Sequence, residues 1–305
     1  MSEINERNEF LLEILVEELP TTEVDGLISQ LQEKVETLLK NENIKYEKIE
    51  TFIAPRRFGF VITGLPDSTP DKLIEKKGPA INVAFDENKQ PTKALLGFLK
   101  SNNSCLDEVK IVENYVYILK VQRGIKIDEF LKNNVPGMIT SLRFRKPMRW
   151  GNGKYEFVRI PHNVFAIYNG KTIDMKIFDI PATNKTVGHR FVMDEYFEVH
   201  SAEEYFSKLR EYYVIAKLED RIEFIKAQLD EFEKSGFQVD KDHELIKEVA
   251  ILTEYPKLIT GTFDEKFLNL PQELIKTTIK HHQRSFTVQK EGNITNIFIA
   301  FIDMP

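Results

Sequence analysis

The sequence predicts an α+β fold, with mixed or antiparallel sheets and helices packed against them. Strand-like segments occur in pairs around short polar turns, such as Glu113-Asn114 and Asn169-Gly170, and tight turns of this kind join antiparallel strands. Helical segments stand between these pairs instead of following each strand, as they would in a doubly wound parallel sheet. These observations favour the α+β class over the α/β class.

The N-terminal part of the chain predicts a strand, a long helix and a second strand-like run. Residues 10–18 are rich in Leu, Ile and Val and stop before Pro20, as is typical of a strand. Thr22 is expected to cap the following helix. The apolar residues behind it keep helical spacing: Val24, Leu27, Ile28, Leu31, Val35, Leu38 and Leu39. Residues 51–63 are again strand-like, with an interruption at Ala54-Pro55-Arg56-Arg57.

The middle of the chain predicts a short helix and two hairpins. The helix opens at Pro91-Thr92 and runs through Lys100. One hairpin covers residues 109–121. The other covers residues 164–178 and gives the clearest signal in the sequence, because Asn169-Gly170 supplies the two positive-φ positions of a type I′ turn.

Helices dominate after residue 195. Ser201 and Glu204 form the pattern of a capping box, and an apolar stripe predicts another helix up to Ser235-Gly236. Two further helices are expected near residues 242–252 and 271–282. A strand pair from Phe286 to Ile302 completes the prediction.

This change of character divides the expected molecule into two lobes. Residues 1–195 are expected to form an α+β lobe and residues 196–305 a helix-rich α+β lobe. No low-complexity tract or flexible linker separates them, so we expect the lobes to pack as one composite unit. An apolar strand that reaches Pro305 without a polar tail indicates a chain that continues in a longer protein.

Composition indicates a globular protein of a reducing compartment. Hydrophobic residues make up 42% and charged residues 30% of the 305 residues, as in ordinary globular domains. The single cysteine, Cys105, allows neither an internal disulfide nor a cysteine-based zinc site. No segment has the pattern of a signal peptide or a membrane span, so we expect a cytoplasmic protein with no membrane partner.

Charge is unevenly distributed along the chain. The net charge is −6, yet the 26 residues between Glu129 and Glu156 contain no acidic residue. Their cations are Lys132, Arg143, Arg145, Lys146, Arg149 and Lys154. An acidic protein with one basic segment suits selective RNA contact, because phosphate attraction then acts at one face.

Five residues of this basic segment are the first candidates for RNA binding: Arg143, Arg145, Lys146, Arg149 and Trp150. A guanidinium group can pair bidentately with phosphate, and the only tryptophan can stack on an unpaired base. The alternative is that Trp150 belongs to the core and the arginines pair with the acidic helices after residue 195.

Four further cations are weaker RNA-binding candidates. Arg56 and Arg57 lie in a strand-like run, where alternation sends neighbouring side chains to opposite faces. A buried ion pair with Glu17 or Glu18 is the alternative role for this pair. His282 and Arg284 close the helix predicted from residue 271, where the helix dipole alone would favour cations.

No catalytic residue and no metal site is predicted. Gly151-Asn152-Gly153-Lys154 lacks the spacing of a phosphate-binding loop, and neither signature of the ATP-using synthetase active sites is present. The 6 histidines are scattered, and the neighbours His281 and His282 would point about 100° apart on a helix. The residues alone therefore favour a binding module without a cofactor of its own.

Short segments spread over nearly the whole chain resemble the bacterial glycyl-tRNA synthetase beta subunit family. They include Leu11-Leu12-Glu13, Glu17-Glu18-Leu19-Pro20, Ala54-Pro55-Arg56-Arg57, Lys77-Gly78-Pro79-Ala80, Pro91-Thr92-Lys93-Ala94, Lys146-Pro147-Met148-Arg149-Trp150-Gly151, Gly188-His189-Arg190-Phe191, Glu254-Tyr255-Pro256 and His282-Gln283-Arg284-Ser285-Phe286. The order and spacing of these segments make the resemblance specific. Ile160-Pro161-His162-Asn163 and Ile302-Asp303 depart from the family pattern, which weakens any family-specific role for His162 or Asp303.

The resemblance implies a subunit without its own aminoacylation site. In this family an alpha subunit uses ATP and Mg to make glycyl-adenylate and transfers glycine to tRNA(Gly), while the beta subunit binds tRNA. Two alpha and two beta subunits form a heterotetramer. The N-terminal part of the beta subunit is similar to the paired B-type domains, the third and fourth, of the phenylalanyl-tRNA synthetase beta subunit. HD-like, body-tail and anticodon-binding regions normally follow it.

We therefore expect a non-catalytic, tRNA-handling segment of glycine–tRNA ligase that is inactive alone. Two alternatives stay open: a freestanding RNA- or aminoacyl-RNA-binding module with an editing-like activity, and a purely architectural partner of the alpha subunit. The lack of a poised nucleophile argues against hydrolysis. Glycine also needs little editing by size, because no smaller amino acid competes for its pocket.

Overall fold

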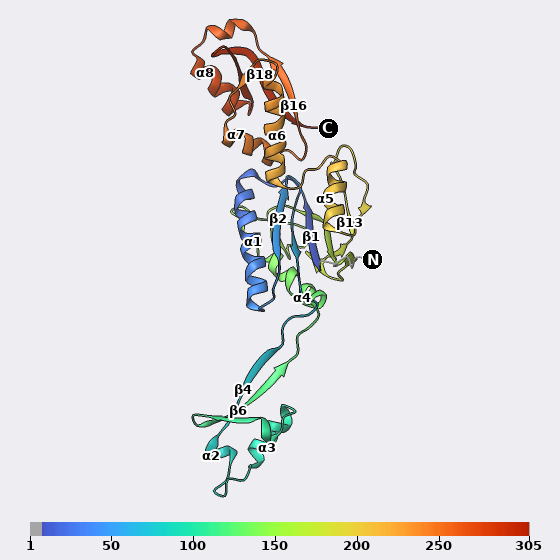
Figure 1. Cartoon of the computed structure of the whole chain (residues 1–305), viewed down its shortest axis with the longest axis vertical. Helices are drawn as coiled ribbons and strands as arrows, with labels where there is room; N and C mark the ends of the chain where they lie inside the picture. The colour runs from blue at the N-terminus through green and yellow to red at the C-terminus, as the bar shows by residue number, and fades with distance from the viewer. Residues whose placement is uncertain (1–7, 305) are drawn as a thin grey trace, which may run out of the picture. The chain divides into compact units, whose positions relative to one another are not determined.

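The computed structural model describes residues 8–304 and has the α+β class that the sequence predicts. It divides into a main unit, formed by residues 8–66 and 128–304, and an inserted unit, Asp67–Ile127 (Figure 1). The sequence did not indicate this inserted unit. A boundary between lobes at residue 195 stays a prediction. Among the described residues, no helix is long and apolar enough to cross a membrane.

The main unit contains a seven-stranded sheet with the order β11-β12-β9-β1-β3-β2, and β10 pairs with β9 at its side. All neighbours are antiparallel except β12 and β9, which are parallel. The strands are β1 (Glu9–Val16), β2 (Lys48–Ala54), β3 (Arg57–Thr63), β9 (Pro161–Tyr168), β10 (Lys171–Thr172), β11 (Lys176–Ile177) and β12 (Ile180–Thr183). Strand β1 is buried on both faces because its sequence is a nearly continuous apolar run.

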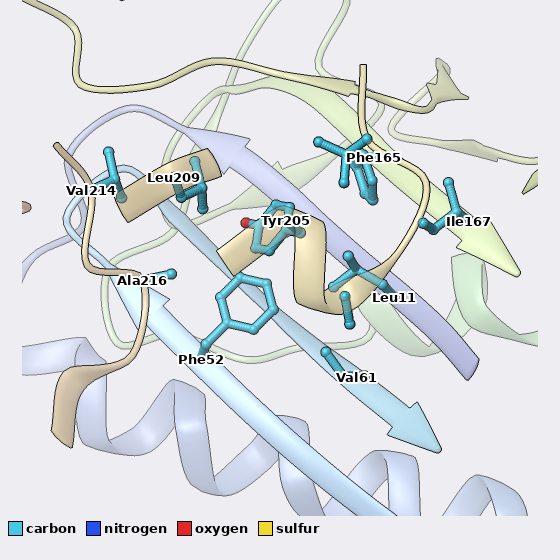
Figure 2. Packing of buried hydrophobic residues seen from close by; sticks show 11 residues of the cluster. Leu11, Phe52, Val61, Phe165, Ile167, Tyr205, Leu209, Val214 and Ala216 are labelled. Carbon is cyan, nitrogen blue, oxygen red and sulfur yellow. The ribbon is translucent and has the colours of Figure 1, made fainter. Parts of the chain in front are cut away.

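Helix α5 (Ala202–Glu211) covers one face of this sheet. Tyr205 and Leu209 of α5 pack on Leu11, Phe52 and Phe165 from three strands (Figure 2). On the opposite face of β1, alternate apolar residues are also fully buried. The other helices of the main unit are α1 (Val24–Asn41), α4 (Ile127–Thr140), α6 (Leu218–Glu233), α7 (His243–Leu252) and α8 (Gln272–Thr277).

A second sheet lies in the C-terminal part of the main unit, with the antiparallel order β15-β17-β18-β16. Its strands are β15 (Gln238–Val239), β16 (Pro256–Thr262), β17 (Phe286–Lys290) and β18 (Asn293–Asp303). Helix α6 packs against both α7 and β16. Two short pairs complete the unit: β13 (Lys185–Thr186) with β14 (Phe197–Glu198), and β7 (Met148–Arg149) with β8 (Glu156–Phe157).

The inserted unit is a three-stranded antiparallel sheet with two helices. Its strand order is β4 (Lys72–Ala80), β6 (Tyr115–Gln122) and β5 (Val109–Val112), and its helices are α2 (Ile81–Ala84) and α3 (Lys93–Ser101). The helices cover one sheet face, where Leu95 and Leu99 pack on Val116 and Ile118. The two ends of the unit pair with each other through a bridge between Ser68 and Lys126.

Most expected elements are confirmed, but three local predictions are wrong. Thr22 does not cap α1, because a 3-10 turn, η1 (Thr21–Glu23), leads into the helix instead. The second strand of the Asn169-Gly170 hairpin ends at Thr172. The predicted last helix changes after α8 into a π-helical turn, η4 (Thr278–His282). The interruption expected at residues 54–57 is confirmed, since Pro55-Arg56 is the two-residue turn between β2 and β3.

Candidate nucleic-acid interface

The basic segment 143–150 follows α4 and is held by its backbone. The side-chain amide of Gln30 on α1 accepts from the Arg143 N–H at 2.9 Å and donates to the Arg143 carbonyl at 2.8 Å. A carboxylate oxygen of Glu23 accepts from the Arg145 N–H at 3.3 Å. Because the polypeptide is fixed by these groups, its cationic side chains are free to point into solvent.

Three of these cations have no acidic partner. Arg143, Arg145 and Lys146 are exposed, and within residues 8–304 no carboxylate forms an ion pair with them. Arg149 pairs with Glu156 at 2.9 Å, but both side chains are largely exposed. A surface pair of this kind contributes about 0–1 kcal/mol, so phosphate can replace the carboxylate. None of the four pairs with the acidic helices after residue 195.

Trp150 is half-buried, so it is neither a core residue nor a free stacking platform. Its ring meets the edge of Phe178 at 5.9 Å between centroids. Phe178 in turn packs on Phe157 at 4.8 Å, and Phe157 on Phe144 at 4.8 Å. Phe144 and Trp150 of the basic segment therefore pack on this aromatic cluster, while part of the indole stays accessible.

Arg57 is not available for RNA, because its side chain has no exposed surface. Its guanidinium lies 3.0 Å from a Glu13 oxygen and 3.4 Å from a Glu254 oxygen, and it donates to the carbonyl of Val187 at 2.9 Å. Burial opposes the charged form, but the two carboxylates outweigh it and raise the pKa of Arg57. The candidate RNA role of Arg57 is therefore corrected to a buried ion pair, with Glu13 and Glu254 instead of Glu17 or Glu18.

Glu13 is the centre of this buried network. It accepts hydrogen bonds from the hydroxyl groups of Thr186, at 2.6 Å, and Tyr205. Burial, together with the negative charge of Glu13, raises the pKa of Tyr205 well above its ordinary value, so the phenol keeps its proton. A buried group of this kind holds segments together and does not exchange protons with a substrate.

A second buried arginine, Arg221 on α6, lies near the same centre. It donates to backbone carbonyls, among them Ile53 at 2.7 Å and Ala250 at 2.8 Å. Burial lowers the pKa of Arg221 to about 10, against the opposing effect of the Glu254 carboxylate. It remains charged at neutral pH, so Arg57 and Arg221 together balance Glu13 and Glu254.

The remaining candidates are Arg56, Arg284 and His282. Arg56 is half-buried in the β2–β3 turn, and its Nε has no hydrogen-bond partner among the described residues. Arg284 is exposed but pairs with Glu248 at 2.7 Å. His282 is exposed at the end of η4. The described residues contain no group of three or more His, Cys, Asp or Glu side chains that could hold a metal ion.

Comparison with known proteins identifies the family. The model of the family described as "Glycyl-tRNA synthetase beta subunit" matches residues 10–305. The chain belongs to this family. The curated glycine–tRNA ligase beta subunit of Thermotoga maritima is 42% identical over 296 residues, and that of Clostridioides difficile is 36% identical over 299 residues. These alignments cover 97% and 96% of the chain, but only 44% of either relative.

Family membership confirms the resemblance that the sequence motifs carried. The relatives are named as subunits of an aminoacyl-tRNA synthetase, and the chain spans less than half of their length. The structure shows what one of the residues that depart from the family pattern contacts. Asp303, one of them, accepts from the N–H groups of Glu254 and Tyr255 at 2.8 and 2.9 Å and lies 3.4 Å from His189 Nε2. It therefore ties the end of β18 to the buried centre.

An apolar groove in the C-terminal part of this family member escaped sequence analysis. It has a volume of about 650 Å³ and lies between β18, α8, η4 and the 3-10 helix η3 (Glu265–Asn269). Its apolar lining is Phe263, Phe267, Leu270, Leu274, Ile275, Ile279, Phe298 and Ala300. Leu274 is 51% exposed. In the sequence these residues look like ordinary core positions, so only the folded arrangement reveals that Phe267, Leu270 and Leu274 are exposed while Ile275 and Ile279 form the buried floor.

Proposed function

We propose that this chain is a non-catalytic, tRNA-handling segment of a glycine–tRNA ligase beta subunit. It would bind tRNA(Gly) while an alpha subunit, using ATP and Mg, attaches glycine in a cytoplasmic heterotetramer of two alpha and two beta subunits. Membership of the family supports this role. Within that proposal, the paired B-type domains of the phenylalanyl-tRNA synthetase beta subunit are the expected structural counterpart.

The observation that carries the tRNA role is the basic segment. Arg143, Arg145 and Lys146 project from a backbone that Gln30 and Glu23 fix in place. Three uncompensated cations on a short stretch of an otherwise acidic chain attract a polyanion and release its counterions on binding. A fixed backbone limits the conformational entropy lost when these side chains meet phosphate.

The test is the triple variant Arg143→Ala/Arg145→Ala/Lys146→Ala, titrated with tRNA(Gly) at several salt concentrations. Each lost phosphate contact should reduce the slope of log affinity against log salt by about 0.9. The matched control is Lys40→Ala/Lys45→Ala/Lys171→Ala. It removes three exposed cations that have no ion pair within residues 8–304, and it makes the same change in net charge.

The melting temperature of both variants should stay close to that of the parent, because solvated surface charges usually change stability by less than about 0.5 kcal/mol. An equal loss of tRNA affinity in both triple variants would reduce the effect to net charge. Unchanged affinity and slope in the Arg143 variant would refute the tRNA role of the basic segment.

The apolar groove favours a second role, as an architectural partner of the alpha subunit. Its exposed side chains Phe267, Leu270 and Leu274 lie close together in sequence, and contiguous apolar surface is one mark of an interaction site. Leu274→Glu places a charge in the groove and should abolish co-purification with the alpha subunit if that subunit fills it. Leu252→Glu is the control, because Leu252 is also exposed, at 38%, but lies outside the groove. Equal co-purification of both variants would exclude this role for the groove.

A further inference from the structure

The sheet of the inserted unit has one covered face and one open face. The covered face carries Val116 and Ile118 of β6, on which α2 and α3 pack (Figure 1). Because side chains alternate along a strand, Tyr115, Tyr117 and Val121 of β6 project from the other side. This side has no helix of the inserted unit packed on it.

The strand registers place further residues on the same side. Leu73 of β4 stands opposite Val121, Lys77 of β4 opposite Tyr117, and Lys110 of β5 opposite Tyr117 from the other flank. The same registers place Glu75 of β4, opposite Leu119, and Val112 of β5, opposite Tyr115, on this side. We call the surface made by Leu73, Glu75, Lys77, Lys110, Val112, Tyr115, Tyr117, Leu119 and Val121 the open face. Tyr117 thus lies between two lysines of the neighbouring strands, with aliphatic side chains toward both ends of the face and one carboxylate, Glu75, on the same side of β4 as Lys77.

The open face is accessible. Leu73 is 72% exposed, Val121 56% and Tyr115 38%. The Lys77 ammonium lies 3.4 Å from the centre of the Tyr115 ring, a cation–π contact that orients both side chains. Large apolar side chains at such exposure, next to a preordered aromatic ring, are the features of a binding surface.

Charge separates this unit from the rest of the chain. Residues 67–127 contain ten Lys and Arg against eight Asp and Glu, whereas the remaining residues contain 32 against 40. Within residues 67–127, Lys77 and Lys110 form no ion pair with any carboxylate. The open face therefore carries two cations, Lys77 and Lys110, that form no ion pair with the residues the structure describes.

We propose that the open face binds unpaired nucleotides of RNA. Bases would stack on Tyr115 and Tyr117, and the phosphates on either side would meet Lys77 and Lys110. This inference rests on the proposed tRNA role and specifies which kind of RNA segment the inserted unit recognises. Unpaired bases offer their flat faces to aromatic rings, whereas the bases of a duplex are already stacked on one another.

Charge complementarity favours RNA over a protein partner. An apolar protein surface would cover the tyrosines but would bury Lys77 and Lys110 without a counter-charge, which is unfavourable. A nucleotide strand supplies a flat apolar group and a negative charge at each step, which suits two tyrosines on β6 with a lysine on each neighbouring strand. Stacking on aromatic side chains beside cations is the usual way to hold single strands.

The first experiment titrates the whole 305-residue chain against an unpaired RNA of about 12 nucleotides, a length typical of single-strand sites, and against the corresponding duplex. Fluorescence anisotropy measures both affinities at several salt concentrations. Lys77→Ala/Lys110→Ala should reduce the salt slope for the unpaired RNA by about 0.7 for each phosphate contact. Lys93→Ala/Lys100→Ala is the matched control, because both lysines are exposed on α3 and make the same charge change.

The second experiment tests stacking. Tyr115→Leu and Tyr117→Leu keep an apolar side chain but remove the aromatic face, so each should lower the affinity for unpaired RNA by about 5- to 150-fold. Circular dichroism shows whether the inserted unit still folds in these variants. If it does not, the lysine pair, whose side chains are exposed, decides the question on its own.

Three results would overturn the inference. One is equal affinity for the unpaired RNA and the duplex, and another is an equal loss in the Lys77 and Lys93 variants. The third is unchanged RNA affinity together with lost association with the alpha subunit, which would make the open face a protein interface. If the Arg143 variant loses tRNA binding while the open-face variants do not, only this inference fails. If the chain binds neither tRNA nor unpaired RNA, the proposed function fails with it.

Discussion

Replacement of Arg57 by Met tests whether the buried charges are structural. The substitution removes the guanidinium but keeps a long apolar side chain, so it leaves Glu13 fully buried without its cation. Breaking one partner of a buried ion pair typically costs about 3–5 kcal/mol. Because whole domains are stable by only about 5–15 kcal/mol, the main unit should lose a large part of its stability.

Urea unfolding followed by circular dichroism measures this loss. Arg56→Met is the matched control, because Arg56 is half-buried in the adjacent turn and its Nε has no partner among the described residues; it should cost about 1 kcal/mol or less. Adding Glu13→Gln to Arg57→Met removes both charges while the amide can still bond Thr186 and Tyr205. The double variant should therefore lose less than the sum of the single losses, by about 0.5–3 kcal/mol.

The affinity of Arg57→Met for tRNA distinguishes a structural role of Arg57 from a role in RNA binding. At a temperature where Arg57→Met is still folded, it should bind tRNA as the parent does, because Arg57 presents no surface to a ligand. A variant that kept its stability within about 1 kcal/mol, which is below the range for a broken buried pair, would refute the structural role. Lost tRNA affinity at unchanged stability would restore Arg57 as an RNA-binding residue.

Three further predictions concern backbone packing, pH and catalysis. Gly59→Ala should lower the free energy of unfolding by about 1–3 kcal/mol, because a Cβ there would lie 2.0 Å from the Leu12 carbonyl oxygen. Gly26→Ala, in open space on α1, should raise it by up to about 1 kcal/mol. Thermal unfolding measures both, and equal effects would refute this. Burial opposes ionisation of Asp303, but the nearby His189 and two backbone N–H groups lower its pKa below the ordinary 3.8. The ionised carboxylate therefore stabilises the folded protein fully above pH 3.8, and this stabilisation is lost as the pH falls below that value. The melting temperatures of the parent and Asp303→Asn should therefore converge in acid and differ near neutral pH, and a constant difference would contradict this. Finally, the 305-residue chain alone should catalyse no glycine-dependent exchange of pyrophosphate into ATP, because its sequence lacks an ATP-binding motif.

The elements that sequence predicted well are those specified by neighbouring residues. Asn169 and Gly170 adopt φ values of 48° and 74°, as a type I′ turn requires. The Ser201 side chain caps α5 by accepting from the Glu204 N–H. The basic segment was also visible, because an acid-free stretch can be read directly from the chain. Its fixation by Gln30 was not, because that contact joins residues 113 positions apart.

The inserted unit escaped prediction for two physical reasons. Strand β4 reads KLIEKKGPA, and charged residues on both of its faces hide the alternating pattern of a strand. The ends of the unit also give no linker signal, since they pair with each other through Ser68 and Lys126 instead of forming a flexible connection. The partner of Arg57 was missed for a related reason. Glu13, in the middle of an apolar strand, signals a buried cation, but nothing local says which one.

The buried centre leads to a last prediction, on how the main unit folds. Glu13 and Arg57 come from the first strands, whereas Tyr205 and Glu254 come from beyond residue 195. A chain cut at residue 195 would leave Glu13 and Arg57 without these partners and would uncover the apolar face that α5 covers. We therefore expect residues 1–195 expressed alone to be unstable, and co-expression with residues 196–305 to restore a protease-resistant complex.

Limited proteolysis of the intact chain provides the complementary measurement. Cleavage near residue 195 should be slow, and it should not release two stable fragments, because the four buried charges balance only when both parts are present. Rapid release of two fragments that each unfold cooperatively would show that the lobes are independent. In that case the Glu13–Arg57 pair would have to be stable without Glu254, and Arg57→Met would destabilise the N-terminal fragment alone.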